Sequence, residues 1–419
     1  MKISVIIYPI VIILSLNLSS LFTTSSSSLS VLAMNTMKKE RIIRSFITGL
    51  IGDALSLGGH YEYDAKKIKA QVGRYTDYLP PGESNNGIGW GTANYHPGKK
   101  AGDLTDTGDI AIMLLECIAM EGGGKKENYS FDKYAKYWYK QITIEGYGSC
   151  NFQSVGRDAK GCPPGLKPGY INGGSRRTLL ALSMSPNAIG DQRKALAADV
   201  NCLIAATHFL PLFLISDDEE YLVKESIATV YISHRNRDPV AAAEFLSRAM
   251  YNLIYRDMNL QLALELAAQK TNYPLIQKWL HDAIAKVDEV NTSTSALSKE
   301  VFVDDIAITS MARLWDVGKT EPIKIGKASP TEGALPSALY FALKYQHDVE
   351  EALIANAGCG GDSAARAMVI GMLLGAQQSF HGFDVNHRWI NGLHAYHKVI
   401  TLIDMTTLST QQQQQQQDL

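Results

Sequence analysis

The spacing of apolar residues constrains the fold most, because from Met37 onward they recur every three or four positions. An α-helix gathers residues at this spacing on one face, whereas a half-buried strand alternates apolar with polar residues. No run of comparable length alternates in that way. The helical spacing is clearest in residues 42–50, 110–118, 228–232, 249–254 and 368–374. We therefore predict an all-α fold, a single compact bundle of helices.

Acidic residues mark two of the predicted helix starts. Asp218 stands shortly before Tyr221, and Asp238 with Pro239 stands before Val240. Aspartate caps the first turn of a helix, and proline is tolerated there. We expect helices to begin at both points.

The domain organisation follows from length and from the absence of a compositional break. A chain of 419 residues with 46% hydrophobic residues could form one large domain or several smaller ones. We find no linker between Met37 and Ser409, which favours one domain over residues 37–409. The glutamine run that follows has no apolar surface to bury, so we predict a disordered tail over residues 410–419.

The N-terminus has the pattern of a targeting segment. Lys2 precedes an apolar run from Ile3 to Leu16, followed by a region rich in serine and threonine. The run is about 14 residues long, shorter than the ~20 that span a bilayer as a helix. We predict that residues 1–36 are removed and that no stable membrane span remains; the alternative is a signal anchor extended through Phe22. The pattern is compatible with secretion and with a plastid-like organelle, and does not separate them.

The charge balance excludes one class of partner. The chain carries 40 basic and 42 acidic side chains, a net charge of -2. A nucleic-acid-binding protein relies on a basic surface, so we predict no nucleic-acid partner. Small neutral or mildly anionic ligands remain open.

Three segments far apart in the sequence place acidic or hydroxyl side chains beside glycines at predicted helix ends. Oxygen groups of this kind can converge on a divalent cation, and glycines at helix ends suit a phosphate. Any one segment alone could be an ordinary acidic helix cap, but the three together favour a binding site. The candidates are Asp53 and His60 in the first segment, Thr105, Asp106 and Asp109 in the second, and Gly360, Gly361, Asp362 and Arg366 in the third.

In this order and separation, the segments resemble the ADP-ribosylglycohydrolase family, which includes the dinitrogenase reductase-activating glycohydrolase. The family motifs are G-D-A-x-G-x-x-x-E, T-D-D-T, and G-G-D-x-D-T followed by a G-x-x-x-G-A helix. Further matches to family elements lie at residues 172–177, 206–211 and 335–339, and the likeness covers about residues 41–393. The resemblance implies an all-helical domain with two magnesium or manganese ions. It also implies release of ADP-ribose from a modified side chain by metal-assisted attack of water at the anomeric carbon.

Carried over position by position, the resemblance gives an incomplete metal site. Thr105, Asp106 and Asp362 match metal-ligand positions. Four other family positions hold different residues here, namely Thr107, Ala364, Ala365 and, in place of the glutamate, His60. The resemblance therefore implies one Mg²⁺ or Mn²⁺ ion, or none. It further implies catalytic roles for Asp53, Asp109 and His60, and ligand binding by Gly360, Gly361, Arg366 and Asn172.

The replacements are similar to those of a side branch that includes jellyfish lens crystallins and selenoprotein J. Arg366 follows Asp362 by four residues, which places the two on one helix face. Its guanidinium could provide a fixed cation where the family holds a metal, or the two could form a plain surface pair.

The sequence thus predicts an ADP-ribosylglycohydrolase-like hydrolase acting on a small-molecule or protein-linked ADP-ribose-like ligand. The alternative is a non-catalytic relative that binds such a ligand or has a structural, crystallin-like role. The missing metal ligands distinguish the two.

Overall fold

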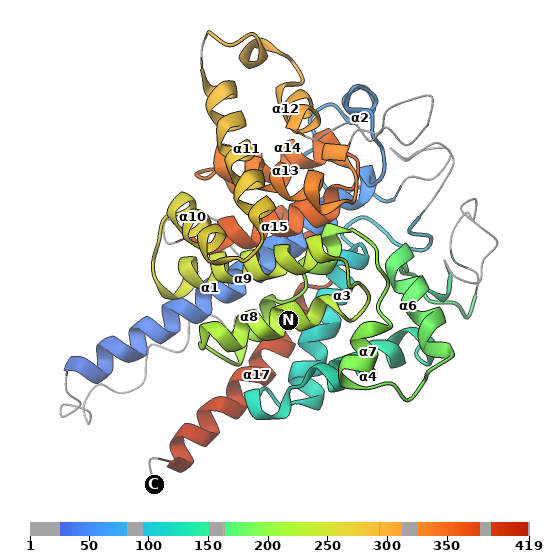
Figure 1. Ribbon diagram of the computed structural model, residues 1–419, viewed down its shortest axis with the longest axis vertical. Coiled ribbons are helices and arrows are strands. Elements are labelled where there is room, and N and C mark those ends of the chain that lie inside the picture. Colours follow the sequence, from blue (N-terminus) through green and yellow to red (C-terminus); the bar gives the residue numbers. More distant parts are fainter. Residues whose placement is uncertain are drawn as a thin grey trace, which may run out of the picture. The chain divides into compact units, whose positions relative to one another are not determined.

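Helices form all the regular secondary structure in the part of the chain that the structure, a computed structural model, describes. That part comprises residues 26–81, 95–150, 162, 164–292, 294–311, 325–377 and 387–417. Within it the only β-type pairings are two isolated bridges, between His60 and Gly361 and between Ala198 and His234. The predicted all-α fold is confirmed (Figure 1).

The helices vary from short connecting turns to long core elements. They are α1 Ser26–Ser56, α2 Ala65–Val72, α3 Asp106–Glu116, α4 Phe131–Thr143, α6 Gly173–Ser183, α7 Gly190–Ala195, α8 Glu219–Val230, α9 Arg237–Tyr255, α10 Leu260–Lys270, α11 Pro274–Asn291, α12 Val303–Met311, α13 Thr331–Lys344, α14 Val349–Cys359, α15 Ser363–Gly375, α16 Arg388–Gly392 and α17 Tyr396–Gln417. A π-helical turn, Cys117–Glu121, extends α3. Among the central elements, α15 packs against α13 and α14, and α9 packs against α8 and α10.

The chain divides into two units, Met1–Glu40 and Arg41–Leu419. In the first unit the described residues begin at Ser26, within α1. Most of the predicted leader, residues 1–25, lies outside the described residues, so its removal stays a prediction. Among the described helices one stretch, Thr36–Gly59, is long and apolar enough to cross a membrane, but 89% of its most apolar window is buried inside the protein. A core helix meets the same criterion.

Within the second unit, glycines allow α1 and α15 to approach closely. A Cβ atom on Gly371 would lie 2.5 Å from the carbonyl oxygen of Thr48, and one on Gly49 would lie 2.8 Å from Met368 Sδ. Both distances are too short for real contacts. The predicted G-x-x-x-G-A helix thus serves close helix packing, which fixes the start of α15 relative to the end of α1.

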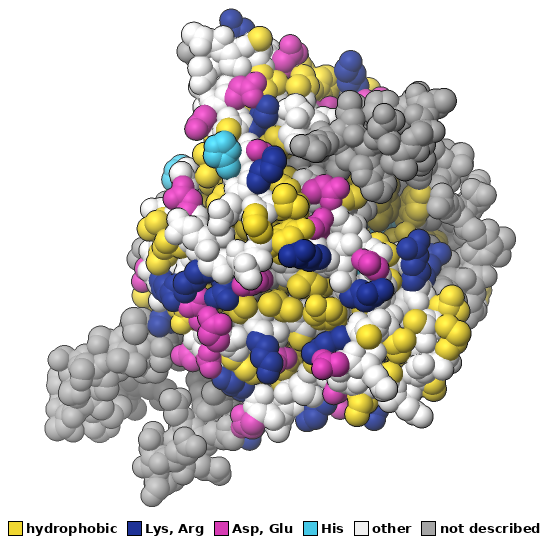
Figure 2. Space-filling model, viewed as in Figure 1, with side chains coloured by type: hydrophobic (Ala, Val, Ile, Leu, Met, Phe, Trp, Pro, Cys, Tyr) yellow, Lys and Arg dark blue, Asp and Glu magenta, His cyan; other side chains and the backbone are white. Residues whose placement is uncertain are grey.

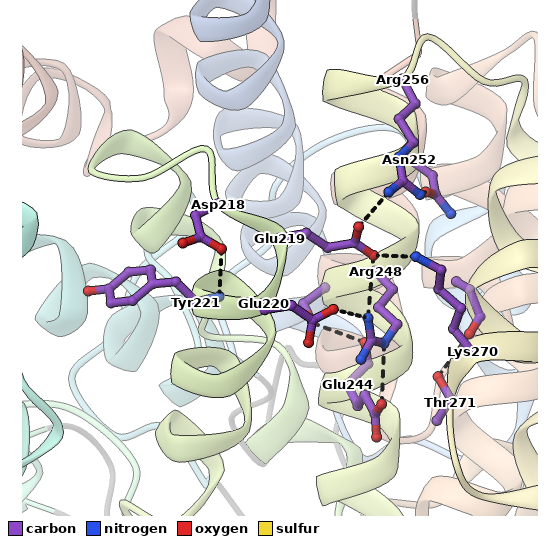
Figure 3. Close-up of polar contacts among 12 residues, drawn as sticks. Asp218, Glu219, Glu220, Tyr221, Glu244, Arg248, Asn252, Arg256, Lys270 and Thr271 are labelled. Atoms are coloured by element: carbon purple, nitrogen blue, oxygen red, sulfur yellow. Dashed lines mark hydrogen bonds and ion pairs between the residues drawn. The ribbon is translucent and has the colours of Figure 1, made fainter.

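The helix starts match the sequence prediction at one point and differ at another. Asp218 caps α8 by accepting a hydrogen bond from Tyr221 N at 3.1 Å, as predicted (Figure 3). Helix α9 begins earlier than predicted, at Arg237, and its cap is Asn236, which accepts from Asp238 N at 3.1 Å. The Asp238 carboxylate is not a cap because it accepts hydrogen bonds from Asn201 and Tyr273.

The C-terminal end also differs from the prediction. Helix α17 runs to Gln417 and therefore includes the glutamine run, for which we expected disorder. Glutamine has favourable intrinsic helix propensity, so a helix already formed by the preceding apolar residues can continue through it.

The surface agrees with the near-zero net charge. On the face shown in Figure 2, basic and acidic side chains are interspersed rather than gathered into separate regions. Neither the basic nor the acidic side chains form a large patch on that face.

Candidate functional site

A cavity of about 130 Å³ lies where the starts of α3, α6 and α15 meet. Its lining includes His60 and Tyr61 after α1, Asp106 in α3, Tyr170 and Asn172 before α6, and Ser329 and Asp362 before α13 and α15. Tertiary structure thus brings together residues from all three segments that the sequence singled out. Five of these seven belong to predicted motifs or stand directly beside them, whereas Tyr170 and Ser329 do not.

Asp106 is the most unusual group in this cavity. It is the first residue of α3 and is 1% exposed. Its Oδ2 accepts a hydrogen bond from Asn172 Nδ2 at 3.1 Å, while Oδ1 has no hydrogen-bond partner among the described residues. Burial raises the pKa of Asp106 to about 7, although the bond from Asn172 opposes the shift. Asn172, predicted as a ligand-binding residue, therefore orients Asp106 and also caps α6 by accepting from Ser175 N.

Asp362 is held by two side chains. Its Oδ1 lies 3.1 Å from His60 Nε2, and its Oδ2 accepts from Ser329 Oγ at 2.6 Å. Burial pushes the pKa of Asp362 upward, but the hydrogen bonds and charge of these neighbours outweigh it and leave the pKa below its usual value. An ionised carboxylate only accepts hydrogen bonds, so His60 Nε2 carries the proton in this pair.

Thr105 and Asp53 form a closed pair beside the cavity. Asp53 accepts from Thr105 Oγ1 at 2.5 Å and from Thr105 N at 2.7 Å, so both of its oxygens are engaged. Thr105 Oγ1 also accepts from Thr107 N, as the cap of α3. Burial raises the pKa of Asp53 to about 6, and the bonds from Thr105 limit the rise. The predicted catalytic Asp53 and metal ligand Thr105 thus hold the start of α3 in place.

The glycine loop before α15 is stabilised from within the protein. Gly361 N donates to the carbonyl oxygen of Glu62 at 2.6 Å, and Asp362 N donates to that of Lys327 at 2.7 Å. Gly360 has a φ of +67°, and a Cβ atom on it would lie 2.2 Å from the Glu62 oxygen. The amides of Gly361 and Asp362 are therefore already bonded within the protein, and the predicted ligand binding by Gly360 and Gly361 stays a prediction.

The surface-pair interpretation of Arg366 is wrong, whereas its role as a fixed cation or ligand-binding residue stays a prediction. The residue is 0% exposed, so it does not form a surface pair. Its guanidinium donates to Asn356 Oδ1 at 2.9 Å and to the carbonyl oxygens of Asp362 and Gly360 at 3.2 and 2.6 Å. Through these three oxygens it holds the glycine loop to the ends of α14 and α15. Two of these oxygens are backbone carbonyls at the start of α15, and the third is the side-chain oxygen of Asn356 in α14.

Asp109, predicted as catalytic, lies in a different cavity of about 430 Å³. There it accepts hydrogen bonds from Lys99 Nζ at 2.6 Å and from Tyr147 OH at 2.8 Å. The sequence grouped Asp109 with Asp106 because they are three residues apart, but the surrounding loops direct the two side chains to separate cavities.

The residues at the cavity do not fit a resident divalent cation. A hard cation of this kind needs several free oxygen ligands. Both oxygens of Asp53 and both of Asp362 are engaged, and Asp106 alone retains an unpartnered one. Among the described residues no group of three or more His, Cys, Asp or Glu could hold a metal. His60, which replaces the family glutamate, bonds the carboxylate that would otherwise be a ligand.

Aromatic rings form one wall of the cavity. The centroid of Tyr61 lies 4.0 Å from that of His60 and 6.3 Å from that of Tyr170. Tyr61 has a φ of +68°, an uncommon conformation for a tyrosine. Its amide donates to Gly361 O at 2.8 Å, which holds this conformation. The position of Tyr61 directly after His60 was the available sequence signal; Tyr170 had none.

The cavity lining includes the buried His234, which lies close enough to a second buried histidine, His208, to affect its pKa. Burial lowers the pKa of His234 to about 4. Burial also lowers the pKa of His208 to about 3, and the nearby His234 adds a smaller decrease. His234 Nε2 packs on Gly174, where a Cβ atom would lie 2.1 Å away. Both rings are neutral near pH 7.

Together, the fold and the site define a protein whose described part is helical and whose cavity, at the starts of α3, α6 and α15, is lined by carboxylates. The chain belongs to the ADP-ribosylglycohydrolase family, whose model matches residues 34–417. A solved structure titled "ADP-ribosylglycohydrolase-related protein complex" is similar to it, with a TM-score of 0.56 and 16% sequence identity over 88% of this chain and 98% of that one. At that identity the likeness shows the fold alone. No curated protein matches the sequence.

The family resemblance inferred from the motifs is therefore confirmed, whereas the narrower likeness to the crystallin and selenoprotein J branch stays a prediction. The family assignment gives a hydrolase-type fold. The roles of individual site residues stay predictions, with the geometry above as their basis.

Proposed function

We propose that the protein binds an ADP-ribose-like ligand, free or protein-linked, at the cavity beside Asp106 and without a resident divalent metal. The observation that carries the proposal is the enclosed, unpartnered Asp106 Oδ1. A buried polar atom without a partner is destabilising, so a ligand hydroxyl that donates to it is favourable. Family membership supports a ribosyl ligand, and the engaged oxygens of Asp53 and Asp362 argue against a metal.

Hydrolysis is the second candidate function, and the same oxygen favours it. A carboxylate with one free oxygen can take a proton from water as the water attacks the anomeric carbon. The bond between that carbon and the modified side chain breaks, and the proton passes to the released side-chain atom, which frees ADP-ribose. The metal-assisted route is not proposed, because the donor set does not fit the ion. Binding without turnover would instead support the non-catalytic, crystallin-like role.

Calorimetric titration with ADP-ribose tests the proposal. We expect binding with equal affinity in magnesium and in a chelator, and loss of at least about tenfold in Asp106→Asn. Incubation with an ADP-ribosylated peptide, followed by chromatography of released ADP-ribose, then separates hydrolysis from binding alone. Binding that requires magnesium would contradict the metal-free site.

The targeting segment is a separate proposal. We propose that the natural protein enters the secretory pathway or an organelle and begins between Ser30 and Met37 after cleavage. N-terminal sequencing of protein purified from its host checks this. Recovery of intact Met1 would contradict it.

A further inference from the structure

The exposed side of helix α6 begins at the cavity. Gly173, the first residue of α6, lines the cavity and is itself exposed, and a Cβ atom placed on it would meet no atom within 4 Å. Arg177, Leu180 and Met184 follow at spacings of four, three and four residues, so all four residues lie on one side of the helix. They are all exposed and form a continuous surface that starts at the cavity, here called the α6 strip.

Two large apolar side chains of the α6 strip are mostly in solvent. Leu180 is 65% exposed and Met184 is 76% exposed, and neither belongs to the hydrophobic core of the described residues. Figure 2 shows exposed hydrophobic side chains over α6. Single exposed apolar residues are ordinary, whereas neighbouring ones indicate an interaction surface. The fold gains no burial from these two side chains, but a partner that covers them would.

The charge of the α6 strip favours an acidic partner. Residues 173–190 contain no Asp or Glu, and Arg177 is exposed without a hydrogen bond or ion pair to any described residue. The adjacent Arg176 lies over the ring of Tyr170, which lines the cavity. A guanidinium without a counter-charge, in a segment that lacks carboxylates, is complementary to a carboxylate of a partner.

The geometry of the helix sets how far each contact lies from the cavity. At ~1.5 Å per residue, Leu180 is about 10 Å and Met184 about 16 Å from Gly173 along the helix axis. An extended peptide covers ~3.3 Å per residue, so its residues about three and five positions from the cavity would reach these two side chains. Positions three and five point to the same side of an extended chain, so both can face the helix.

We propose that the α6 strip docks the protein that carries the ADP-ribose-like group. An acidic side chain of that protein pairs with Arg177, and apolar side chains cover Leu180 and Met184. The placement of the modified residue at the cavity rests on the proposed function. The docking itself rests on the exposed residues of α6.

The test uses the full chain and calorimetric titration with two synthetic peptides, both ADP-ribosylated on a central arginine. The first peptide has glutamate two positions and leucine three and five positions from that arginine, on both sides of it. The second has lysine and serine at the same places. We expect the first to bind at least about tenfold more tightly, because only it offers apolar area and carboxylates to the α6 strip.

Two variants show whether α6 is the source of the preference. Leu180→Ser combined with Met184→Ser should remove most of it and leave the affinity for free ADP-ribose unchanged. Arg177→Gln should remove a smaller share. As a matched control, Leu262→Ser combined with Leu275→Ser changes two leucines that are each 41% exposed on α10 and α11, and it should leave the preference intact. All these side chains are exposed, so the variants should fold, as circular dichroism checks.

The first peptide without its ADP-ribose group separates the two proposals. Binding of this unmodified peptide that is lost in the Leu180 and Met184 double variant, with no binding of ADP-ribose, would support docking on α6 and contradict the proposed function. Binding of ADP-ribose together with equal affinity for the two modified peptides would overturn the docking inference and leave the proposed function standing.

A lipid surface is the other occupant that the test covers. Flotation with vesicles of phosphatidylcholine and phosphatidylserine measures binding to an anionic membrane, and we expect the parent and the double variant to behave alike. Vesicle binding that disappears in the double variant, without any preference between the peptides, would assign the α6 strip to a membrane and overturn the inference of a protein partner.

Discussion

The starts of α3 and α8 both carry acidic residues in their first turn, and the two behave in opposite ways. At the start of α8, Glu219 contacts Arg248, Arg256 and Lys270 (Figure 3). Burial alone would raise the pKa of Glu219, but the bond from Lys270 and the surrounding cations lower it. At the start of α3, Asp106 meets an amide instead of a cation, and its pKa rises to about 7. The local sequence pattern is alike, so the difference comes from what the tertiary structure places opposite each carboxylate.

The comparison shows which acidic cluster is a candidate site. The α8 cluster, defined by Glu219, Glu220, Glu244 and their cationic partners, satisfies its charges within the protein and is a stabilising network. The α3 cavity leaves the buried Asp106 Oδ1 without a partner, which is unfavourable unless a ligand supplies a donor.

The largest expected effect concerns Arg366. Arg366→Ala leaves three buried oxygens around the glycine loop without their donor, so we expect the free energy of unfolding to fall by about 3–5 kcal/mol. Lys270→Ala, which removes a 47% exposed cation from the α8 cluster, should lower it by about 1 kcal/mol or less. Urea denaturation measures both. Equal losses would show that the glycine loop does not depend on this clamp.

The second prediction uses pH, because the two regions should titrate in different windows. An unfolded histidine takes up a proton below about pH 6.5, whereas buried His234 does so only near its pKa of about 4. The contribution of His234 to the free energy of unfolding is therefore fully present above pH 6.5. It falls by about 3 kcal/mol as the pH decreases toward 4. Glu219 has a lowered pKa, so its contribution is present above its unfolded value of 4.5 and is lost at still lower pH. The raised pKa values of Asp106 and Asp53 act in the opposite direction over this range, so the histidine step is measured as the difference between the parent and His234→Gln in denaturation from pH 8 to 3.5.

The third prediction is that neutralising the acidic side chain changes the free energy of unfolding in opposite directions at the two helix starts. Above pH 7 the fold keeps Asp106 ionised against the effect of burial, so Asp106→Asn should raise the free energy of unfolding at pH 8 by about 1–3 kcal/mol. Glu219→Gln should lower it by about 1 kcal/mol, since it weakens pairs with three cations. Destabilisation by both substitutions would mean that Asp106 is a structural residue like Glu219.

The smallest effect is expected from divalent metals. Because the cavity offers one free carboxylate oxygen, millimolar Mg²⁺ or Mn²⁺ should shift the melting temperature by less than about 1 °C. Thermal melts in metal and in chelator measure this. A stabilisation of several degrees that disappears in Asp106→Asn would place a metal at the cavity after all.

The sequence by itself determined the fold class, the family and the identity of most residues at the cavity. Apolar spacing reveals helices because side-chain burial has the period of the helix, and the ordered motifs lie at helix ends whose positions are set by local chemistry. The Asp218 cap and the G-x-x-x-G-A helix were likewise predictable from short stretches of sequence.

Only the tertiary structure decided what each polar group contacts. Asp106 and Asp109 are three residues apart yet lie in different cavities, and Arg366 clamps a loop although its spacing from Asp362 suggested a pair on the helix face. Ser329 and Tyr170 reach the cavity from segments that had no motif. Hydrogen-bond partners, burial and pKa depend on atoms from distant parts of the chain, so residue spacing along one segment does not determine them.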